Sequence, residues 1–216
     1  MSIRELSEQE IIRRESLNKL RELGINPYPA DEYTITNSCA ELKEKYNPEE
    51  NNFQEVSIAG RLMGQRIMGK ASFAEIQDES GRIQLYINRD ELCPGEDKTL
   101  YNDVFKKLFD IGDIIGVKGF VFITQMGETS VHVKELVLLS KSLRPLPIVK
   151  EKDGQTFDAF TDPETRYRQR YVDLIVNPLV RETFKNRTKV INTMRQMFNE
   201  RGYLEVETPI LQPIPG

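Results

Sequence analysis

The stretch that decides the predicted fold is VSIAGRLMGQRIMGKASFAEIQDESGRIQLYINR, which spans Val56 to Arg89. Residues 56–62 alternate apolar with small or polar side chains, and residues 71–77 and 83–87 do the same. This period of two is typical of half-buried β-strands. The sequence Asp-Glu-Ser-Gly at 78–81 predicts a tight turn between the second and third runs. We therefore expect three consecutive strands joined by turns.

Glycines inside the first run indicate how these strands are arranged. Gly60 and Gly64 interrupt the strand, and glycine within a strand usually marks a bulge or a sharp bend. A bent strand followed by two more strands favours a small closed barrel over a flat sheet.

One face of the second and third predicted strands combines aromatic, amide and carboxylate groups. Its members are Phe73, Glu75, Gln77, Gln84 and Tyr86. An aromatic ring beside amides on an exposed barrel face can stack and hydrogen-bond unpaired bases. A core position for Phe73 and solvated amides would explain the same pattern.

Composition limits the possible functions. The chain has 216 residues, of which 30% are charged and 38% hydrophobic, as is typical of a soluble globular protein of one or two domains. Its formal net charge of -4 means that contact with nucleic acid would need a local basic patch. Cys39 and Cys93 have no CxxC spacing, and the single histidine, His132, leaves no zinc signature. No signal peptide or long apolar run is present, so we expect no membrane contact and a cytoplasmic location.

The predicted helix over residues 7–24 is amphipathic. Ser7 and Glu10 form a capping box at its start. Its apolar stripe consists of Ile12, Leu20 and Leu23, with basic residues on the other faces. A solvated amphipathic helix and a basic helix close to a phosphate backbone explain this pattern equally well.

The middle of the chain completes a five-stranded barrel. Helices are predicted over residues 38–46 and 99–109, the second at a place where such barrels commonly carry a helix. Residues 114–124 and 130–139 are predicted as the fourth and fifth strands. His132 lies in the last strand, where a structural role is favoured because no acid or nucleophile partner is evident.

The last third of the chain has a different character. Residues 142–158 contain prolines and a glycine that predict an irregular linker. A helix then begins at Asp162-Pro163, a longer one spans 178–202, and residues 202–211 are predicted as a short strand. Residues 166–201 contain nine basic and three acidic residues, a net charge of +6. Solvated helix faces, or contact with RNA or an anionic substrate, would explain this charge.

Several strings resemble the class II aminoacyl-tRNA synthetases. The helix that ends at Arg201-Gly202-Tyr203, followed by VETPIL at 206–211, is similar to motif 1 of that class. The strings RIMGKASF at 66–73, RPLP at 144–147 and RYRQRYVDL at 166–174 resemble the lysyl-tRNA synthetases of class II in order and spacing. The resemblance covers nearly the whole chain, from about Ile3 to Gly216.

This resemblance implies a mainly β architecture with flanking helices. Residues 1–54 would be an N-terminal helical extension and residues 55–140 an OB-fold that binds the tRNA anticodon. Residues 141–160 would be a linker, and residues 161–216 the first helices of a class II catalytic domain. The parent enzyme would activate lysine with ATP and Mg²⁺ and esterify it to tRNA(Lys).

The resemblance also implies what this segment would lack. Motifs 2 and 3, which hold ATP in the family, would lie beyond Gly216, so the chain is expected to be an inactive fragment with no bound cofactor. No catalytic or metal-binding residue is therefore assigned. Pro209 would lie at the interface of a full-length homodimer, although a simple turn proline explains it as well.

Four residues match positions that read the anticodon in related synthetases. Arg66, Phe73 and Gln84 match the residues that hold the central uridine, and Glu128 matches a position that reads a flanking base. Phenylalanine can stack on a splayed-out base, glutamine can both donate to and accept from uracil, and arginine can bind a carbonyl or phosphate. For Glu128, a solvated turn glutamate is the alternative.

Two other functions compete with this interpretation. A free-standing OB-fold that binds single-stranded nucleic acid would not need the motif 1 segment. An aspartyl- or asparaginyl-tRNA synthetase would share the barrel, but the strings at 144–147 and 166–174 resemble the lysine family.

Overall fold

The computed structural model describes residues 6–147, 150–152, 155–157 and 160–209 of the chain. The chain divides into two compact units, Met1–Pro145 and Leu146–Gly216. Within the described residues, no helix is long and apolar enough to cross a membrane.

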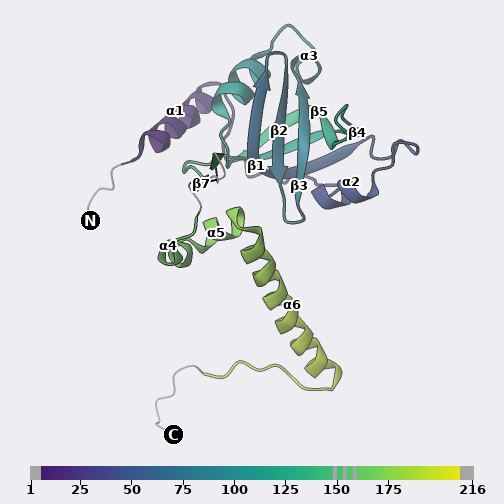
Figure 1. The fold of residues 1–216 in the computed structure, drawn as a ribbon, viewed down its shortest axis with the longest axis vertical. Helices are drawn as coiled ribbons and strands as arrows, with labels where there is room; N and C mark the ends of the chain where they lie inside the picture. Colours follow the sequence, from purple (N-terminus) through teal and green to yellow (C-terminus); the bar gives the residue numbers. More distant parts are fainter. Residues whose placement is uncertain (1–5, 148–149, 153–154, 158–159, 210–216) are drawn as a thin grey trace. The chain divides into compact units, whose positions relative to one another are not determined.

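The first unit contains the predicted five-stranded closed barrel, with the strand order β1-β2-β3-β5-β4 (Figure 1). Four of its pairings are antiparallel, and β3 pairs with β5 in parallel. The strands are β1 (Val56–Met68), β2 (Ala71–Gln77), β3 (Arg82–Asn88), β4 (Ile114–Ile123) and β5 (Thr129–Ser140). Along β2 and β3 the side chains alternate between buried and partly exposed positions, as the period-two pattern predicts.

Bulges allow this short barrel to close. The β1–β2 register shifts between Leu62 and Gly64, and the β4–β5 register shifts between Lys118 and Gly119. At Gly119 a Cβ atom would lie 1.9 Å from the backbone oxygen of His132, so only glycine fits there.

The predicted helix at 99–109 is a π-helix, η1 (Leu100–Leu108). Tyr101 and Phe105 in this helix and Phe109 directly after it are spaced four residues apart, and their neighbouring ring centroids are separated by 5.9 and 6.2 Å. The hydroxyl groups of the buried Tyr101 and Ser72 lie 2.7 Å apart, which ties this helix to β2.

The N-terminal helix, α1 (Glu8–Glu22), begins with the predicted capping box at Ser7. Its predicted apolar stripe is confirmed at Leu20, which is fully buried, and is wrong at Ile12 and Leu23, which are 42% and 48% exposed. The buried face holds polar as well as apolar residues: Glu10, Arg13, Ser16, Leu17 and Leu20. Two short helices, α2 (Cys39–Lys45) and α3 (Arg89–Leu92), flank the barrel.

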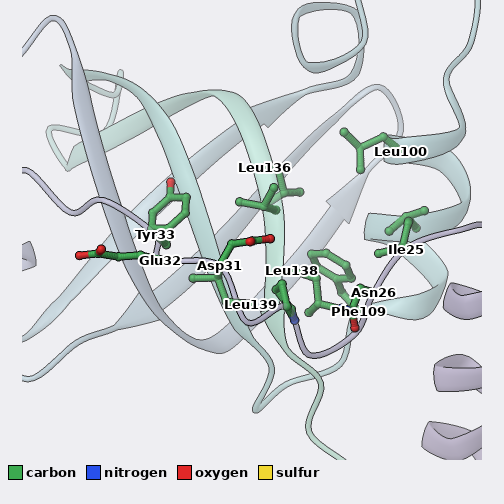
Figure 2. Close-up of a pocket in the computed structure, with 13 residues that line it drawn as sticks. Ile25, Asn26, Asp31, Glu32, Tyr33, Leu100, Phe109, Leu136, Leu138 and Leu139 are labelled. Carbon is green, nitrogen blue, oxygen red and sulfur yellow. The ribbon is translucent and has the colours of Figure 1, made fainter.

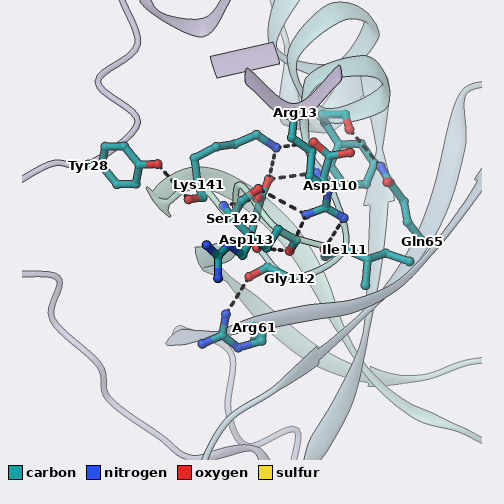
Figure 3. Close-up of polar contacts among 12 residues, drawn as sticks. Arg13, Tyr28, Arg61, Gln65, Asp110, Ile111, Gly112, Asp113, Lys141 and Ser142 are labelled. Atoms are coloured by element: carbon teal, nitrogen blue, oxygen red, sulfur yellow. Dashed lines mark hydrogen bonds and ion pairs between the residues drawn. The ribbon is translucent and has the colours of Figure 1, made fainter. Parts of the chain in front are cut away.

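Arg13 connects α1 to the end of the barrel (Figure 3). Its guanidinium donates to the backbone oxygens of Ile111, Ser142 and Arg144 at 2.9, 3.2 and 3.4 Å. The side chain is only 5% exposed. Arg13 is therefore neither solvated nor available to a phosphate backbone.

A buried ionic cluster lies beside Arg13 (Figure 3). The fully buried ammonium of Lys141 is 2.5 Å from the carboxylate of Asp110 and 2.8 Å from that of Asp113. Asp113 also accepts hydrogen bonds from the backbone N–H groups of Asp110 and Ser142. Burial raises the pKa of Asp113, while Lys141 and these N–H groups act in the opposite direction.

The segment predicted to be an irregular linker contains a small antiparallel hairpin. Its strands are β6 (Lys150–Lys152) and β7 (Gln155–Phe157), so the prediction was wrong for these residues. The intervening sequence is Asp153-Gly154, the pair typical of two-residue hairpin connections.

The second unit continues with three helices: α4 (Pro163–Arg168), α5 (Arg170–Val176) and α6 (Pro178–Glu200). Asp162 caps α4 by accepting from the N–H of Thr165, as the sequence predicts. The predicted strand after α6 does not form over residues 203–209, where the described residues offer no neighbouring strand. Instead Tyr203 packs on Phe198, with their rings 5.5 Å apart.

Part of the positive charge of the second unit is neutralised internally. Arg166 donates to the buried carboxylate of Asp173 at 3.1 Å, and Arg170 and Asn177 bond the same carboxylate. Burial raises the pKa of Asp173, but these hydrogen bonds and charges outweigh it and hold the pKa below its usual range. These two arginines therefore stabilise the junction of α4 and α5.

The buried cluster predicts a large stability difference between two lysine variants. Lys141→Met should lower the free energy of unfolding by about 3–5 kcal/mol, because it leaves the Asp113 carboxylate buried without its cation. Lys118→Met should have little effect, because Lys118 is exposed and its pairing with Glu135 lies at the surface, where water screens it. Urea titrations of both variants measure the difference.

The pH dependence of the Lys141→Met variant provides the control. A carboxyl group whose pKa is higher in the folded than in the unfolded state stabilises the fold fully at pH values below its unfolded-state pKa. This stabilisation is lost as the pH rises through the folded-state pKa. The loss of unfolding free energy caused by Lys141→Met should therefore be smaller in acid than at neutral pH. Equal losses of unfolding free energy for Lys141→Met and Lys118→Met would contradict the role of Lys141 as the cation that compensates the buried Asp113 carboxylate.

Candidate nucleic-acid interface

The outer face of β1, β2 and β3 brings the predicted base-reading residues together. Arg66 on β1 lies directly across from Phe73 on β2, and Phe73 lies across from Tyr86 on β3. Gln84 is two residues before Tyr86 and points to the same side of the sheet. Three residues that the sequence suggested therefore lie on one continuous surface.

Phe73 is partly exposed and does not belong to the buried core. Its neighbours along β2, Ser72 and Ala74, point inward and are 0% and 3% exposed. The ring leans on Tyr86, with a centroid separation of 5.4 Å and an interplanar angle of 54°. One ring face is therefore supported by protein, and the side chain can offer apolar surface to a base.

Arg66 is exposed and forms no hydrogen bond or ion pair with the described part of the chain. Its guanidinium lies on the strand next to Phe73 and can bind a base carbonyl or a phosphate oxygen.

The side chain of Gln84 is oriented by a buried hydroxyl. The Oγ of Ser130, which is 0% exposed, donates to Gln84 Oε1 at 2.9 Å. This bond turns the amide nitrogen toward Glu128, whose Oε2 lies 3.4 Å from Nε2. The parallel pairing of β3 with β5 positions Ser130 across from Gln84. A donor and a carboxylate acceptor consequently lie side by side at one edge of the site.

Glu128 ends a structured turn between β4 and β5. Its N–H donates to Thr124 Oγ1 at 3.1 Å, and its backbone oxygen accepts from the Thr124 N–H at 3.0 Å. Gly127 adopts a φ of +83°, which the turn requires. The carboxylate is about half exposed, at 49%, and the ammonium of Lys43 is 4.0 Å away. Glu128 is therefore positioned beside Gln84 and accessible to a ligand.

Aromatic residues on β4 and β5 extend this surface. His132 on β5 pairs with Tyr86 on β3 and with Phe120 on β4. Phe122 also lies near His132, with their rings 5.6 Å apart. The sequence analysis did not single out Phe120 and Phe122.

His132 has an acidic neighbour that the sequence did not reveal. The carboxylate of Glu91 is 2.9 Å from His132 Nε2, without the alignment of a hydrogen bond.

A separate hollow of about 370 Å³ lies under the segment that follows α1 (Figure 2). Apolar side chains such as Leu100, Phe109 and Leu138 line it, with Asp31 and Glu32 beside them. Carboxylates at this site would repel phosphate groups. None of the four predicted base-reading residues lines this hollow.

The remaining predicted site residue, Pro209, is exposed in the second unit. Among the described residues, no group of three or more histidine, cysteine, aspartate or glutamate side chains could hold a metal ion.

Comparisons with known proteins agree with this geometry. A family model described as an OB-fold nucleic acid binding domain matches residues 56–139, and one described as tRNA synthetases class II (D, K and N) matches residues 162–216. A lysine–tRNA ligase of Porphyromonas gingivalis is 64% identical over 217 residues, which cover 100% of this chain and 38% of that protein.

Two further relatives support the same assignment. The lysine–tRNA ligase of Azobacteroides pseudotrichonymphae is 62% identical over 98% of this chain and 42% of its own length. That of Christiangramia forsetii is 60% identical over 99% of this chain and 37% of its own length. The chain thus spans about two fifths of the length of the curated relatives it matches. These matches place the chain in the family of class II lysyl-tRNA synthetases, of which it carries the OB-fold nucleic acid binding domain and part of the synthetase domain.

Proposed function

We propose that the barrel recognises the anticodon loop of tRNA(Lys) within a protein that activates lysine with ATP and esterifies it to that tRNA. The observation that carries this proposal is the arrangement of Arg66, Phe73, Gln84 and Glu128 on one outer face of the barrel. A stacking ring, an amide and a carboxylate together can select a base, whereas basic residues alone would bind any RNA.

Each of the four side chains has a distinct part in this recognition. Phe73 stacks on an unpaired base, and Gln84 offers its amide to the edge of that base. Ser130 holds the amide oxygen, and of the two N–H groups on Nε2 one points to Glu128 while the other can donate to a uracil carbonyl. Glu128 accepts from a base N–H group, and Arg66 binds a carbonyl or a phosphate.

The ATP site and the Mg²⁺ of the proposed reaction are not assigned to residues of this chain. Arg166 and Arg170, two arginines near the start of the synthetase domain, already bond Asp173. When bound, ATP and Mg²⁺ supply the activation of the lysine carboxylate.

We further propose that the protein acts as a homodimer in the cytoplasm. No residue of α6 is buried, and the helix exposes Leu179, Met194 and Phe198. A surface with this many exposed apolar side chains favours contact with a partner, and a second copy supplies a matching helix. Pro209 lies exposed beyond this helix, where a subunit contact could cover it.

Aminoacylation of tRNA transcripts tests the proposed activity. The protein that carries this chain should charge tRNA(Lys) with lysine, and should lose efficiency when the central anticodon uridine is changed to cytidine. Charging of another tRNA, or with aspartate or asparagine instead of lysine, would contradict the proposal. RNA binding without any charging activity would indicate a binding module only.

Removing the Phe73 ring should weaken RNA binding without unfolding the barrel. Phe73→Ala is expected to cost about 1–3 kcal/mol of binding free energy for an anticodon stem-loop, the range for one base–aromatic stack. Val137→Ala serves as the control, because Val137 is an exposed residue near the C-terminal end of β5. This variant should bind the stem-loop as the wild-type protein does. If Phe73→Ala instead unfolds the barrel, the ring is a core residue and the proposed role is wrong.

Glu128→Gln should reduce discrimination between uracil and cytosine. Uracil N3–H can donate to a carboxylate, whereas cytosine N3 would face it with a lone pair, and such an unmade bond costs about 1–3 kcal/mol. An amide can donate to cytosine N3, so the variant should narrow the affinity gap between uracil-containing and cytosine-substituted loops. Titrations at one salt concentration measure this gap. Uniformly tighter binding with an unchanged gap would show that Glu128 is only a repulsive charge.

A further inference from the structure

The hollow under the segment that follows α1 has the size and the lining of a small-molecule site (Figure 2). Its volume is about 370 Å³, and ligand pockets typically measure about 300–1,000 Å³. Its apolar walls include Val104 on η1 and Leu136 and Leu138 on β5, which are 2%, 5% and 6% exposed. These three side chains also belong to the barrel core, so the walls of the hollow are held in place.

Residues 29–32 cross this hollow and are anchored only beyond their two ends. We call these four residues the roof. Before the roof, the backbone oxygen of Pro27 accepts a hydrogen bond from the Lys141 N–H at 3.1 Å. After it, the Tyr33 ring packs on Gly116, where a Cβ atom would lie 2.6 Å from the ring. The roof itself forms no hydrogen bond or ion pair with the described part of the chain, so it can move while both anchors stay in place.

The charge of the hollow is confined to one end. The roof residues Asp31 and Glu32 are exposed carboxylates, and none of the described residues that line the hollow is basic. Figure 2 shows these two residues towards one end of the hollow and Ile25 and Leu100 towards the other. A negative end and an apolar end complement a molecule that has an ammonium group and an apolar body. Phosphate-bearing ligands do not suit this site, because the carboxylates repel them.

The volume of the hollow limits the size of its ligand. A water-sized group occupies about 30 Å³ in a liquid, so the hollow has room for roughly ten non-hydrogen atoms. An amine with one aromatic ring or a short alkyl chain has this size. A protein segment suits the hollow less well, because the roof crosses it and limits the length of chain that it can hold.

We propose that this hollow binds a small amphipathic amine, whose apolar body contacts Phe109, Leu136 and Leu138 and whose ammonium group pairs with Asp31 and Glu32. The ammonium group donates charge-assisted hydrogen bonds to these carboxylates, and binding thereby orders the roof. None of the four proposed base-reading residues lines the hollow, so this inference does not depend on the proposed function.

Four matched probes test the charge and the apolar body separately. Phenethylamine has both, phenethyl alcohol replaces the ammonium group by a neutral hydroxyl, hydrocinnamate carries a carboxylate, and ethylamine lacks the ring. Each is titrated by calorimetry into the full-length protein with saturating lysine, which occupies the proposed amino-acid site. We expect a dissociation constant of about 0.1–1 mM for phenethylamine and binding about 5- to 10-fold weaker for the alcohol. Hydrocinnamate and ethylamine should not bind measurably.

Three variants locate the site. Asp31→Asn combined with Glu32→Gln should weaken phenethylamine about 5- to 10-fold and leave the alcohol unchanged. Val137 lines the hollow and is 45% exposed, so Val137→Phe should fill the hollow without disturbing the core and should abolish binding of both probes. Glu44→Gln removes an exposed carboxylate of α2 and serves as the control, which should bind phenethylamine as the wild-type protein does.

Several results would overturn the proposal. Equal affinities for phenethylamine and phenethyl alcohol would show that the carboxylates take no part. Phenethylamine binding that survives Val137→Phe would lie elsewhere on the protein. If none of the probes binds but a short peptide of leucines and one lysine does, and Val137→Phe abolishes that binding, the occupant is a protein segment. Phe73→Ala should bind phenethylamine normally, so failure of the amine site and failure of the proposed RNA recognition are distinguishable.

Discussion

The architecture of the barrel depends on one bent strand that pairs with two neighbours. The first half of β1, Val56–Arg61, pairs with β4, and its second half, Arg61–Met68, pairs with β2. Arg61 takes part in both pairings, so the strand must change direction close to it. The bulge between Leu62 and Gly64 accommodates this change. Because β3 and β5 pair on the other side, the sheet closes and leaves no long free edge.

Closure also creates the candidate site. The parallel β3–β5 pairing places Ser130 across from Gln84 and His132 across from Tyr86, although these partners are more than forty residues apart in sequence. The same pairing brings the turn that carries Glu128 beside Gln84. The proposed base-reading surface lies on strands that each pair with two neighbours. Within it, the hydrogen bond from Ser130 holds the Gln84 amide in place before any ligand arrives.

Charges that stand out in the sequence serve two different purposes in the structure. Arg13, Arg166 and Arg170 have partners within their own units, and Lys141 is fully buried between two aspartates. Arg66 and Lys134 remain exposed on the barrel. For the RNA contact proposed above, the position of the exposed cations matters more than the net charge of the chain, because each neutralised phosphate adds to affinity.

The five barrel strands, their closure, the capped helices and the family could be predicted from the sequence alone. Period-two alternation, glycine positions and capping residues are local signals, and they act over a few residues whatever the rest of the chain does. The choice of Arg66, Phe73, Gln84 and Glu128 as base-reading residues came from the family resemblance together with the chemistry of each side chain. The roles of these residues remain predictions.

Which faces and which distant residues meet depends on the tertiary structure. Apolar periodicity pointed to Ile12, Leu20 and Leu23 on α1, of which only Leu20 is buried. Arg13 lies on the buried side of the helix instead of Ile12, because its guanidinium donates to three backbone carbonyls at the end of the barrel. Likewise, the sequence placed His132 in the fifth strand without relating it to Phe73. The strand order that aligns them results from barrel closure, which depends on pairings between residues far apart in the chain.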